Sequence, residues 1–292
     1  MDDERCFPEG RVTLVGILNL TPDSFSDGGR FVSPEGAIER TAAVEAGLAL
    51  VREGAHVLDV GGESTRPGAE PVSEAEEIRR TAPVLEALAK ASEVRLSVDT
   101  RKLEVAAAAL DAGASILNDV SGLRHDPRLA ELAADRGATL ILGHLRGEPA
   151  TMQDAPAFED VVAEVTAELG ESVARARAAG VADERLVVDP GIGFGKTCAH
   201  NLSLLTSISR IRGALGLPVL VGTSRKSFLG RLVGDGVIAP PHARDAATQA
   251  ADAIAVFQGA DALRVHDVAA AGRTAAVASA LRRARRAGGG AP

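Results

Sequence analysis

The sequence contains no tryptophan or tyrosine, and only 2% of its 292 residues are aromatic. Hydrophobic residues still make up 46% of the chain, so a sizeable core has to be built from alanine, valine, leucine and isoleucine. There are only two cysteines, Cys6 and Cys198, which excludes a disulfide framework and a cysteine-rich metal site. Such sparse cysteine is typical of a reducing cytoplasm, and we expect that location.

Features of exported, membrane-spanning and nucleic-acid-binding proteins are also missing. The first ten residues, MDDERCFPEG, have neither the basic nor the apolar region of a signal peptide. No uninterrupted apolar run approaches the length that crosses a membrane. The formal net charge of −8 argues against a general nucleic-acid surface, although it is compatible with a local cationic pocket. We therefore expect small molecules as partners, and neither nucleic acid nor a membrane.

Short apolar segments alternate with helical patterns along the chain. Four glycine–alanine pairs, which begin at Gly54, Gly113, Gly137 and Gly259, each follow a helical pattern and precede an apolar segment. Glycine just past a helix end adopts the left-handed conformation at little cost, so each pair marks a switch from helix to strand. The complete pattern predicts eight strands, which begin near residues 12, 56, 95, 115, 139, 186, 218 and 262.

Strands that alternate with helices predict a parallel sheet with helical crossovers. Eight such units in 292 residues predict one α/β domain, a (β/α)8 TIM barrel with its active site at the C-terminal strand ends. A doubly wound open sheet is the alternative, but the first strand and loop lack a dinucleotide glycine fingerprint. We expect residues 1–11 to be loose, the barrel to span residues 12–283 and the tail 284–292 to be disordered. The first helix should have Ser33 as its N-cap, with Pro34 at the first helical position, and run to about Glu53.

The segment LVVDPGIGFGKT, residues 186–197, shows most clearly how a strand passes into a functional loop. Pro190 ends the strand, and three glycines then allow turns where a side chain would clash. Asp189 sits at this junction, and a buried carboxylate is costly without a partner. Either the protein supplies that partner, as a salt bridge or loop cap, or a ligand does.

Almost every predicted strand ends on a polar side chain, and in a TIM barrel those ends meet at one rim. These residues are Asn19, Asp59, Asp99, Asn118, His144, Asp189 and His266, and Lys226 lies just past the seventh strand. Strand alternation places Arg264 on the same face as His266, whereas Asp119 and Asp267 point to the other side and are expected to be structural. Asp59 could equally lie behind the site.

Two loops add cationic groups to this rim. Residues 61–71, GGESTRPGAEP, carry Arg66, and residues 223–227, TSRKS, carry Lys226 just before a helix. A helix N-terminus with Lys and Ser nearby favours anions. Together with Arg264 and His266, these groups form a cationic rim on an acidic protein. The pattern predicts an anionic substrate with phosphate-like groups, next to a flat polar heterocycle held by Asp189 and Asn118.

Seven motifs give the chain a family resemblance that extends from about Val12 to Val268. They are GILNLTPDSFSDGG, GGESTRPGA, SVDT, NDVSG, DPGIGFGKT, GTSRKSF and RVHDV. In this order they resemble dihydropteroate synthase. That resemblance implies a transferase of folate biosynthesis that joins p-aminobenzoate to 6-hydroxymethyl-7,8-dihydropterin diphosphate. The products would be 7,8-dihydropteroate and diphosphate, with Mg²⁺ as cofactor and a homodimer as the assembly.

The resemblance also implies roles for single residues. Asp189 would bind the amino and ring N–H groups of the pterin, and Asn118 and Asp99 its other edge. Lys226 would contact the carbonyl side, and Arg264 would pack on the ring and reach phosphate. The residues implied for catalysis are Arg66, Lys226, Arg264 and His266.

The remaining implied contacts concern the diphosphate and the second substrate. The diphosphate would be held by Thr65, Arg66 and His266, and by Mg²⁺ bound through Asn19. The aminobenzoate would be framed by Pro67, Phe194 and Ser227.

One position departs from the family pattern. Gly143 stands where the family often has methionine, and we expect it to leave a gap beside the pterin, with the next residue, His144, facing the helices. Two other interpretations stay open. A pterin-dependent methyltransferase would share the barrel but would not need the phosphate-binding motifs. A non-catalytic paralogue would bind pterin or a partner protein without turnover.

Overall fold

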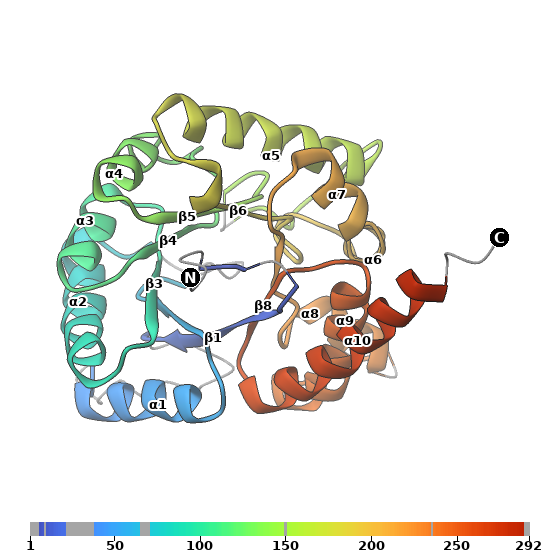
Figure 1. The fold of residues 1–292 in the computed structure, drawn as a ribbon, viewed down its shortest axis with the longest axis horizontal. Coiled ribbons are helices and arrows are strands. Elements are labelled where there is room, and N and C mark those ends of the chain that lie inside the picture. The colour runs from blue at the N-terminus through green and yellow to red at the C-terminus, as the bar shows by residue number, and fades with distance from the viewer. Residues whose placement is uncertain are drawn as a thin grey trace.

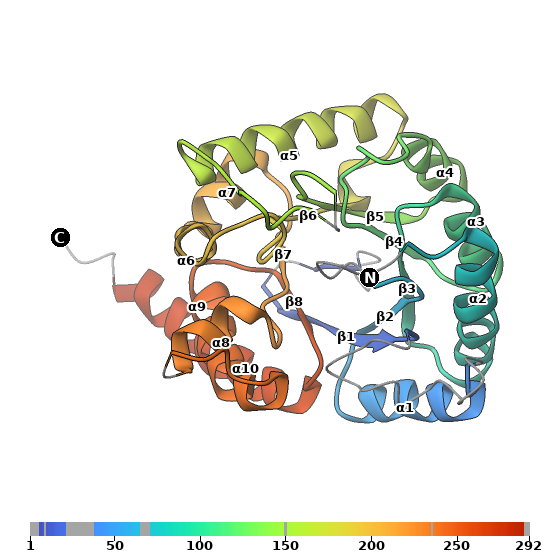
Figure 2. The same ribbon diagram turned by 180° about the vertical axis from the view of Figure 1, so that it is seen from behind.

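The computed structural model describes residues 6–8, 10–21, 38–64, 71–148, 151–234 and 236–288. Within them, eight parallel strands form one sheet in the order β6-β5-β4-β3-β2-β1-β8-β7. A single bridge between Val188 and Val219 joins β6 to β7 and nearly closes the barrel. Helices form an outer ring around the strands, as the two opposite views show (Figures 1 and 2). The predicted (β/α)8 barrel is therefore confirmed.

The strands lie close to their predicted positions. They are β1 (Thr13–Asn19), β2 (Val57–Gly61), β3 (Arg95–Asp99), β4 (Ile116–Asp119), β5 (Thr139–Gly143), β6 (Leu186–Asp189), β7 (Leu220–Val221) and β8 (Ala262–Val265). The α-helices in the described residues are α1 (Arg40–Arg52), α2 (Glu74–Ala91), α3 (Leu103–Asp111), α4 (Arg128–Arg136), α5 (Val161–Ala178), α6 (Cys198–Thr206), α7 (Ile208–Leu215), α8 (Ser227–Val233), α9 (Asp245–Phe257) and α10 (Val268–Gly288). Two short 3-10 helices are η1 (Asp183–Arg185) and η2 (Pro241–Arg244). None of the helices in the described ranges has the length and apolar character needed to span a membrane.

The helix-to-strand switches follow the predicted chemistry. Gly54, Gly113, Gly137 and Gly259 all have positive φ, between 60° and 110°, directly after a helix. A residue with a Cβ is strained in this conformation, which explains why glycine recurs at these four positions.

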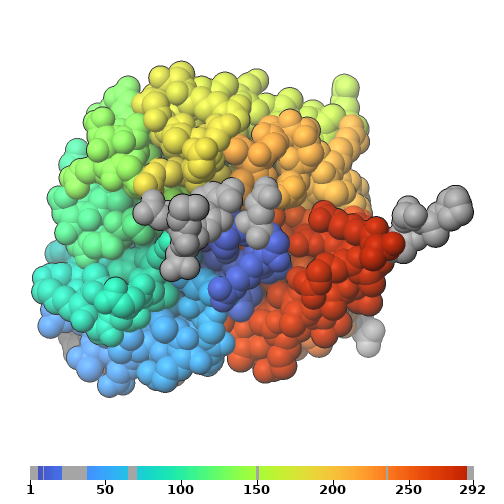
Figure 3. Space-filling model, in the orientation of Figure 1, coloured from blue at the N-terminus to red at the C-terminus, as the bar shows by residue number. Residues whose placement is uncertain are grey.

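The barrel interior is filled by one apolar side chain from each of seven strands. This inner cluster consists of Val15, Val57, Ile116, Ile141, Val187, Leu220 and Ala262, with Phe7 packed against it. Phe7 is only 4% exposed, and Thr139 donates a hydrogen bond to the Cys6 sulfur over 3.3 Å. The blue N-terminal residues accordingly lie at the centre of the face in Figure 3. The prediction of a loose segment 1–11 was wrong for Cys6 and Phe7, because an aromatic ring in a polar stretch closes the end of the barrel.

Two predicted helix boundaries also differ from the structure. Helix α1 begins at Arg40, and the preceding Glu39 is not helical, whereas the expected start at Ser33 lies outside the described residues. At the other end, α10 continues to Gly288, so the expected disorder was wrong for residues 284–288. The sequence there, LRRARRA, combines strong helix formers with basic residues in the last turn, which the helix dipole favours.

Candidate active site

A cavity of about 710 Å³ opens at the C-terminal ends of the strands. It brings together nine residues that the sequence singled out. They are Asn19, Asp99, Asn118, Asp189, Phe194, Lys226, Ser227, Arg264 and His266. The apolar side chains that line it include Ile17, Val120 and Met152. Three further predicted residues, Thr65, Arg66 and Pro67, lie outside the described residues.

The floor of the cavity is a network of buried charges around Arg264. Its Nε donates to Asp59 Oδ2 over 2.6 Å, and its NH2 group donates to Asp99 Oδ2 over 2.8 Å. Asn118 Nδ2 donates to the same Asp59 oxygen over 2.9 Å. Asp59 is fully buried and does not line the cavity, so its role is to hold Arg264 and Asn118 in place. Burial raises the pKa of Asp99 to about 7, and the neighbouring guanidinium opposes that rise.

Asp189 and Lys226 form the second charged group of the cavity. Asp189 Oδ1 accepts a hydrogen bond from Gly191 N over 2.7 Å. Burial raises the pKa of Asp189, while the positive charge of Lys226 opposes this rise. Burial also lowers the pKa of Lys226 to about 8, and its ammonium donates to the Ile192 carbonyl and lies 4.4 Å from the centre of the Phe194 ring. This side of the cavity therefore presents a carboxylate, an ammonium and an aromatic face together.

His266 is oriented by the loop that follows β7. Its Nδ1 lies 2.8 Å from Ser224 Oγ, and its backbone N–H donates to the same oxygen over 3.2 Å. Because Ser224 accepts the backbone proton, it can direct its own hydroxyl proton to Nδ1. The ring of His266 is thereby held at the cavity wall beside Arg264.

Helix α9 holds this β7–α8 loop from behind. Thr223 Oγ1 donates to Asp252 Oδ1 over 2.6 Å, and Arg225 N donates to Thr248 Oγ1 over 3.1 Å. Arg225 has a φ of 58°, which is unusual for a residue with a side chain, and its guanidinium pairs with Asp245. Lys226 follows directly, so these contacts set where its ammonium can reach.

Asp252 should make the stability of the protein depend on pH. It is fully buried, its Oδ2 has no hydrogen-bond partner among the described residues, and burial raises its pKa to about 7. The folded state therefore binds this proton more tightly than the unfolded state, and the free energy of unfolding falls as the pH rises from about 4 to about 7. We expect the stability of Asp252→Asn relative to the parent to improve by about 3 kcal/mol between pH 5 and pH 8.5. Urea unfolding of both proteins at pH 5 and at pH 8.5 measures this change. The same difference in free energy of unfolding between variant and parent at both pH values would contradict the prediction.

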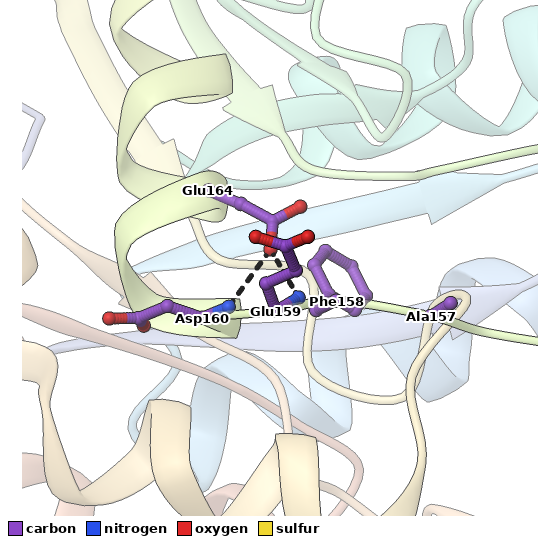
Figure 4. A pocket seen from close by; sticks show the side chains of 5 residues that line it. All are labelled: Ala157, Phe158, Glu159, Asp160 and Glu164. Carbon is purple, nitrogen blue, oxygen red and sulfur yellow. Dashed lines mark hydrogen bonds between the residues drawn. The ribbon is translucent and has the colours of Figure 1, made fainter.

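A second, shallower pocket lies at the start of α5 and is lined by Ala157, Phe158, Glu159, Asp160 and Glu164. Figure 4 shows Glu164 turned back so that its Oε1 accepts from the backbone N–H groups of Glu159 and Asp160. The Asp160 carboxylate accepts from the next two free N–H groups of the helix. These acids satisfy the N-terminus of α5, which is a structural role.

Comparison with known proteins decides the family. The pattern of the pterin binding enzyme family matches residues 15–266. The dihydropteroate synthase of Mycobacterium leprae is 47% identical over 247 residues, which are 84% of each chain. The solved dihydropteroate synthase of Yersinia pestis with a sulfonamide drug complex has a TM-score of 0.87 and 40% identity, and covers 95% of this chain and 96% of that one. The Xanthomonas albilineans enzyme with 4-aminobenzoic acid has a TM-score of 0.82 and 46% identity over 93% of both chains.

The chain belongs to the dihydropteroate synthase family. It is accordingly a transferase, and the resemblance carried by the seven sequence motifs is confirmed. The matched region begins within β1 and includes the other seven strands of the barrel.

The departure from dihydropteroate synthase at Gly143 does not leave the expected gap. A Cβ added there would lie 2.6 Å from Val120 Cα and 2.8 Å from Val120 O, so the backbone of Val120 already fills the space. The gap beside the pterin is therefore absent, and a methionine at this position has no room. His144 faces the helix layer as expected, with its Nε2 3.1 Å from Glu168 Oε2.

Sequence reasoning missed several residues that line the cavity from loops and from η2. They are Glu63, Ser64, Gln153, Ile238, Pro240, Pro241 and Arg244. Strand alternation has no bearing on such loop positions.

Proposed function

We propose that this chain condenses 6-hydroxymethyl-7,8-dihydropterin diphosphate with p-aminobenzoate to give 7,8-dihydropteroate and diphosphate. The observation that carries the proposal is one cavity in which the acceptors Asp189 and Asn118 lie among the cations Lys226 and Arg264. The acceptors match a heterocycle with donor groups, and the cations match the charge of a departing diphosphate. The family member solved with 4-aminobenzoic acid supports the second substrate.

The reaction breaks the bond between the exocyclic methylene carbon of the pterin and the diphosphate oxygen, and the electron pair leaves with the diphosphate. The electron-rich dihydropterin stabilises positive charge on that carbon, so departure can precede attack by the amine. The amine nitrogen then bonds to the carbon and loses a proton. The protein's contribution is mainly electrostatic, because fixed donors and cations are aimed at charge that grows in the transition state. Lys226, Arg264 and His266 supply these groups at the cavity wall.

The pterin end would be bound through charge-assisted hydrogen bonds. The Asp189 carboxylate would accept from the amino and ring N–H groups, and Asn118 and Asp99 would face the other edge. Lys226 would meet the carbonyl side. Arg264 is held by Asp59 and Asp99. We therefore propose that it both supplies positive charge at the cavity floor and packs on the pterin ring.

Mg²⁺ fits the diphosphate end of the cavity. The described residues contain no group of three or more His, Cys, Asp or Glu that could hold a metal by themselves. Asn19 lines the cavity at the end of β1, and an amide oxygen together with phosphate oxygens suits a hard cation that keeps few protein ligands. When bound, Mg²⁺ would neutralise phosphate charge, with Thr65 and Arg66 as the proposed neighbours.

The aminobenzoate would lie between Phe194 and Ser227, with Pro67 as a further proposed contact. Phe194 and Ser227 lie next to Lys226 in the cavity, which would place the attacking amine near the pterin methylene carbon. We also place the enzyme in the cytoplasm, a proposal supported by its two free cysteines.

Product analysis tests the proposed function. Enzyme incubated with both substrates and Mg²⁺ should form a product with the mass of 7,8-dihydropteroate. Omission of p-aminobenzoate should abolish that product. If the pterin diphosphate is still intact after incubation with both substrates, the proposed function is wrong and the non-catalytic interpretation is favoured.

We further propose a homodimer that forms through α9 and α10. Apolar side chains remain exposed on these neighbouring helices, including Ile254 at 47%, Val277 at 64% and Leu281 at 57%. Exposed apolar side chains that gather on one surface are typical of an interface. Light scattering at micromolar concentration should give twice the mass of one chain, and Ile254→Asp should shift it toward one chain. A single-chain mass for the parent protein would contradict the proposal.

A further inference from the structure

The turn after β6 is held by Lys226, by Gln153 and by its own Lys196. Gly191, Gly193 and Gly195 all have positive φ, which gives the turn its shape. Its three successive carbonyl groups each accept a hydrogen bond from a side chain. Lys226 donates to Ile192 O, Gln153 to Gly193 O over 2.7 Å, and Lys196 to Phe194 O over 2.9 Å. Each of the three carbonyl groups from Ile192 to Phe194 therefore has its own side-chain donor.

Lys196 differs from the other two donors because it does not line the cavity. It is 3% exposed, and its ammonium lies 3.0 Å from His144 Nδ1 and 3.4 Å from His144 O. His144 Nε2 in turn lies 3.1 Å from Glu168 Oε2. Glu168 is itself paired with Arg124 and Arg146. A chain of polar groups thus runs from α5 through His144 and Lys196 to the carbonyl of Phe194.

Burial sets the protonation states of the polar groups that run from His144 to Lys196. Burial lowers the pKa of His144 to about 4, so the ring is neutral at pH 7. The neutral ring can donate from Nε2 to Glu168 and accept at Nδ1 from Lys196. An ammonium has three donors, and the three acceptors around Lys196 match them in number.

Burying an ammonium this deeply costs free energy, which hydrogen bonds offset only in part. Burial lowers the pKa of Lys196 to about 7, and a methionine of similar length would avoid the cost of burying the charge. What an apolar side chain could not do is bind the Phe194 carbonyl. The other residues of the turn do not replace this contact, because Gln153 and Lys226 hold different carbonyl groups.

We infer that Lys196 is a positioning residue for the aminobenzoate substrate: it fixes the Phe194 carbonyl and so sets the ring that this substrate packs against. The inference rests on the proposed function, in which Phe194 frames the aminobenzoate. Lys196 touches neither substrate. The Asp189 carboxylate is held by Gly191 N, and the positive charge of Lys196 acts on it from behind the cavity. We therefore expect pterin binding to depend on Lys196 much less than binding of p-aminobenzoate does.

The test is the effect of Lys196→Met on each substrate separately. We expect the KM for p-aminobenzoate to rise about tenfold or more, because the Phe194 wall is no longer held, while the Kd for the pterin diphosphate stays within about threefold. Arg124→Gln is the matched control, since Arg124 contacts Glu168 on the far side of the same cluster. Arg124→Gln should keep the parent values of the KM for p-aminobenzoate and of the Kd for the pterin diphosphate. Equal weakening of both substrates, or an unchanged KM for p-aminobenzoate in a folded protein, would overturn the inference.

Two further arms keep the result decisive. If Lys196→Met does not fold, Lys196→Gln, which keeps a shorter donor, is measured in the same assay. This variant should raise the KM for p-aminobenzoate several-fold. An unchanged KM overturns the inference. In a Phe194→Ala background, Lys196→Met should have little further effect on this KM, because both changes act through one ring. Full additivity of the two changes would contradict a role through Phe194. Turnover by the parent enzyme is measured first, so a failure of the proposed function is seen before any variant is compared.

Discussion

Replacing Asp189 by asparagine should weaken binding of the pterin diphosphate by roughly 10- to 150-fold, which corresponds to about 1.5–3 kcal/mol. The carboxylate lines the cavity with one oxygen already bonded to Gly191 N. An ionised carboxylate only accepts hydrogen bonds, whereas an amide would present a donor to one of the two donor groups of the pterin. Isothermal titration calorimetry with the pterin substrate measures the loss directly.

Asp267→Asn is the matched control for this change. Asp267 follows His266 in the sequence, but its carboxylate accepts from Ala270 N at the start of α10 and does not line the cavity. Asparagine caps a helix about as well as aspartate, so the control should bind the pterin normally. Parent-like pterin affinity in a folded Asp189→Asn variant would refute the assignment of the pterin end.

Replacing Arg264 by alanine should damage both stability and turnover. Its guanidinium is the hydrogen-bonded partner of Asp59 and Asp99, and Asp59 is fully buried. Removing one member of a buried ion pair leaves uncompensated charge and costs about 3–5 kcal/mol. Turnover should fall more than pterin affinity, because the charge that Arg264 faces grows as the diphosphate departs.

Urea unfolding at pH 7.5 and steady-state kinetics separate the two effects. Arg177→Ala is the comparison, since Arg177 pairs with Asp183 at the exposed end of α5 and such a pair is worth at most about 1 kcal/mol. The double variant Asp59→Asn/Arg264→Gln should recover much of the lost stability without recovering turnover. The account of the cavity floor fails if Arg264→Ala is no less stable than Arg177→Ala.

The fold could be predicted closely because its signals are local. Apolar runs, helix patterns and glycine–alanine pairs recur along the chain, and each strand begins within two residues of its predicted start. The polar strand ends could be predicted for the same reason, since a parallel barrel brings them to one rim. Asp119 was also expected to be structural, and it accepts from the backbone N–H groups of Ser121 and Leu123.

What could not be predicted depends on contacts between distant parts of the chain. The sequence separates Arg264 from Asp59 by more than two hundred positions, so no periodicity reveals their ion pair. Gly143 was expected to leave a gap beside the pterin. The backbone of Val120 fills that space, and no feature of the sequence indicates this close approach. Phe7 lies in a polar segment, and only the closed barrel gives its ring a place to pack. Lys196 and His144 likewise acquire their roles through packing.

Diphosphate release is the most direct test of the proposed condensation. The enzyme is incubated with the pterin diphosphate and Mg²⁺, with and without p-aminobenzoate, and inorganic diphosphate is measured over many turnovers. We expect sustained release only when both substrates and Mg²⁺ are present, and loss of that release in Arg264→Ala. Sustained release that does not respond to p-aminobenzoate, or no release with the complete mixture, would contradict the central claim.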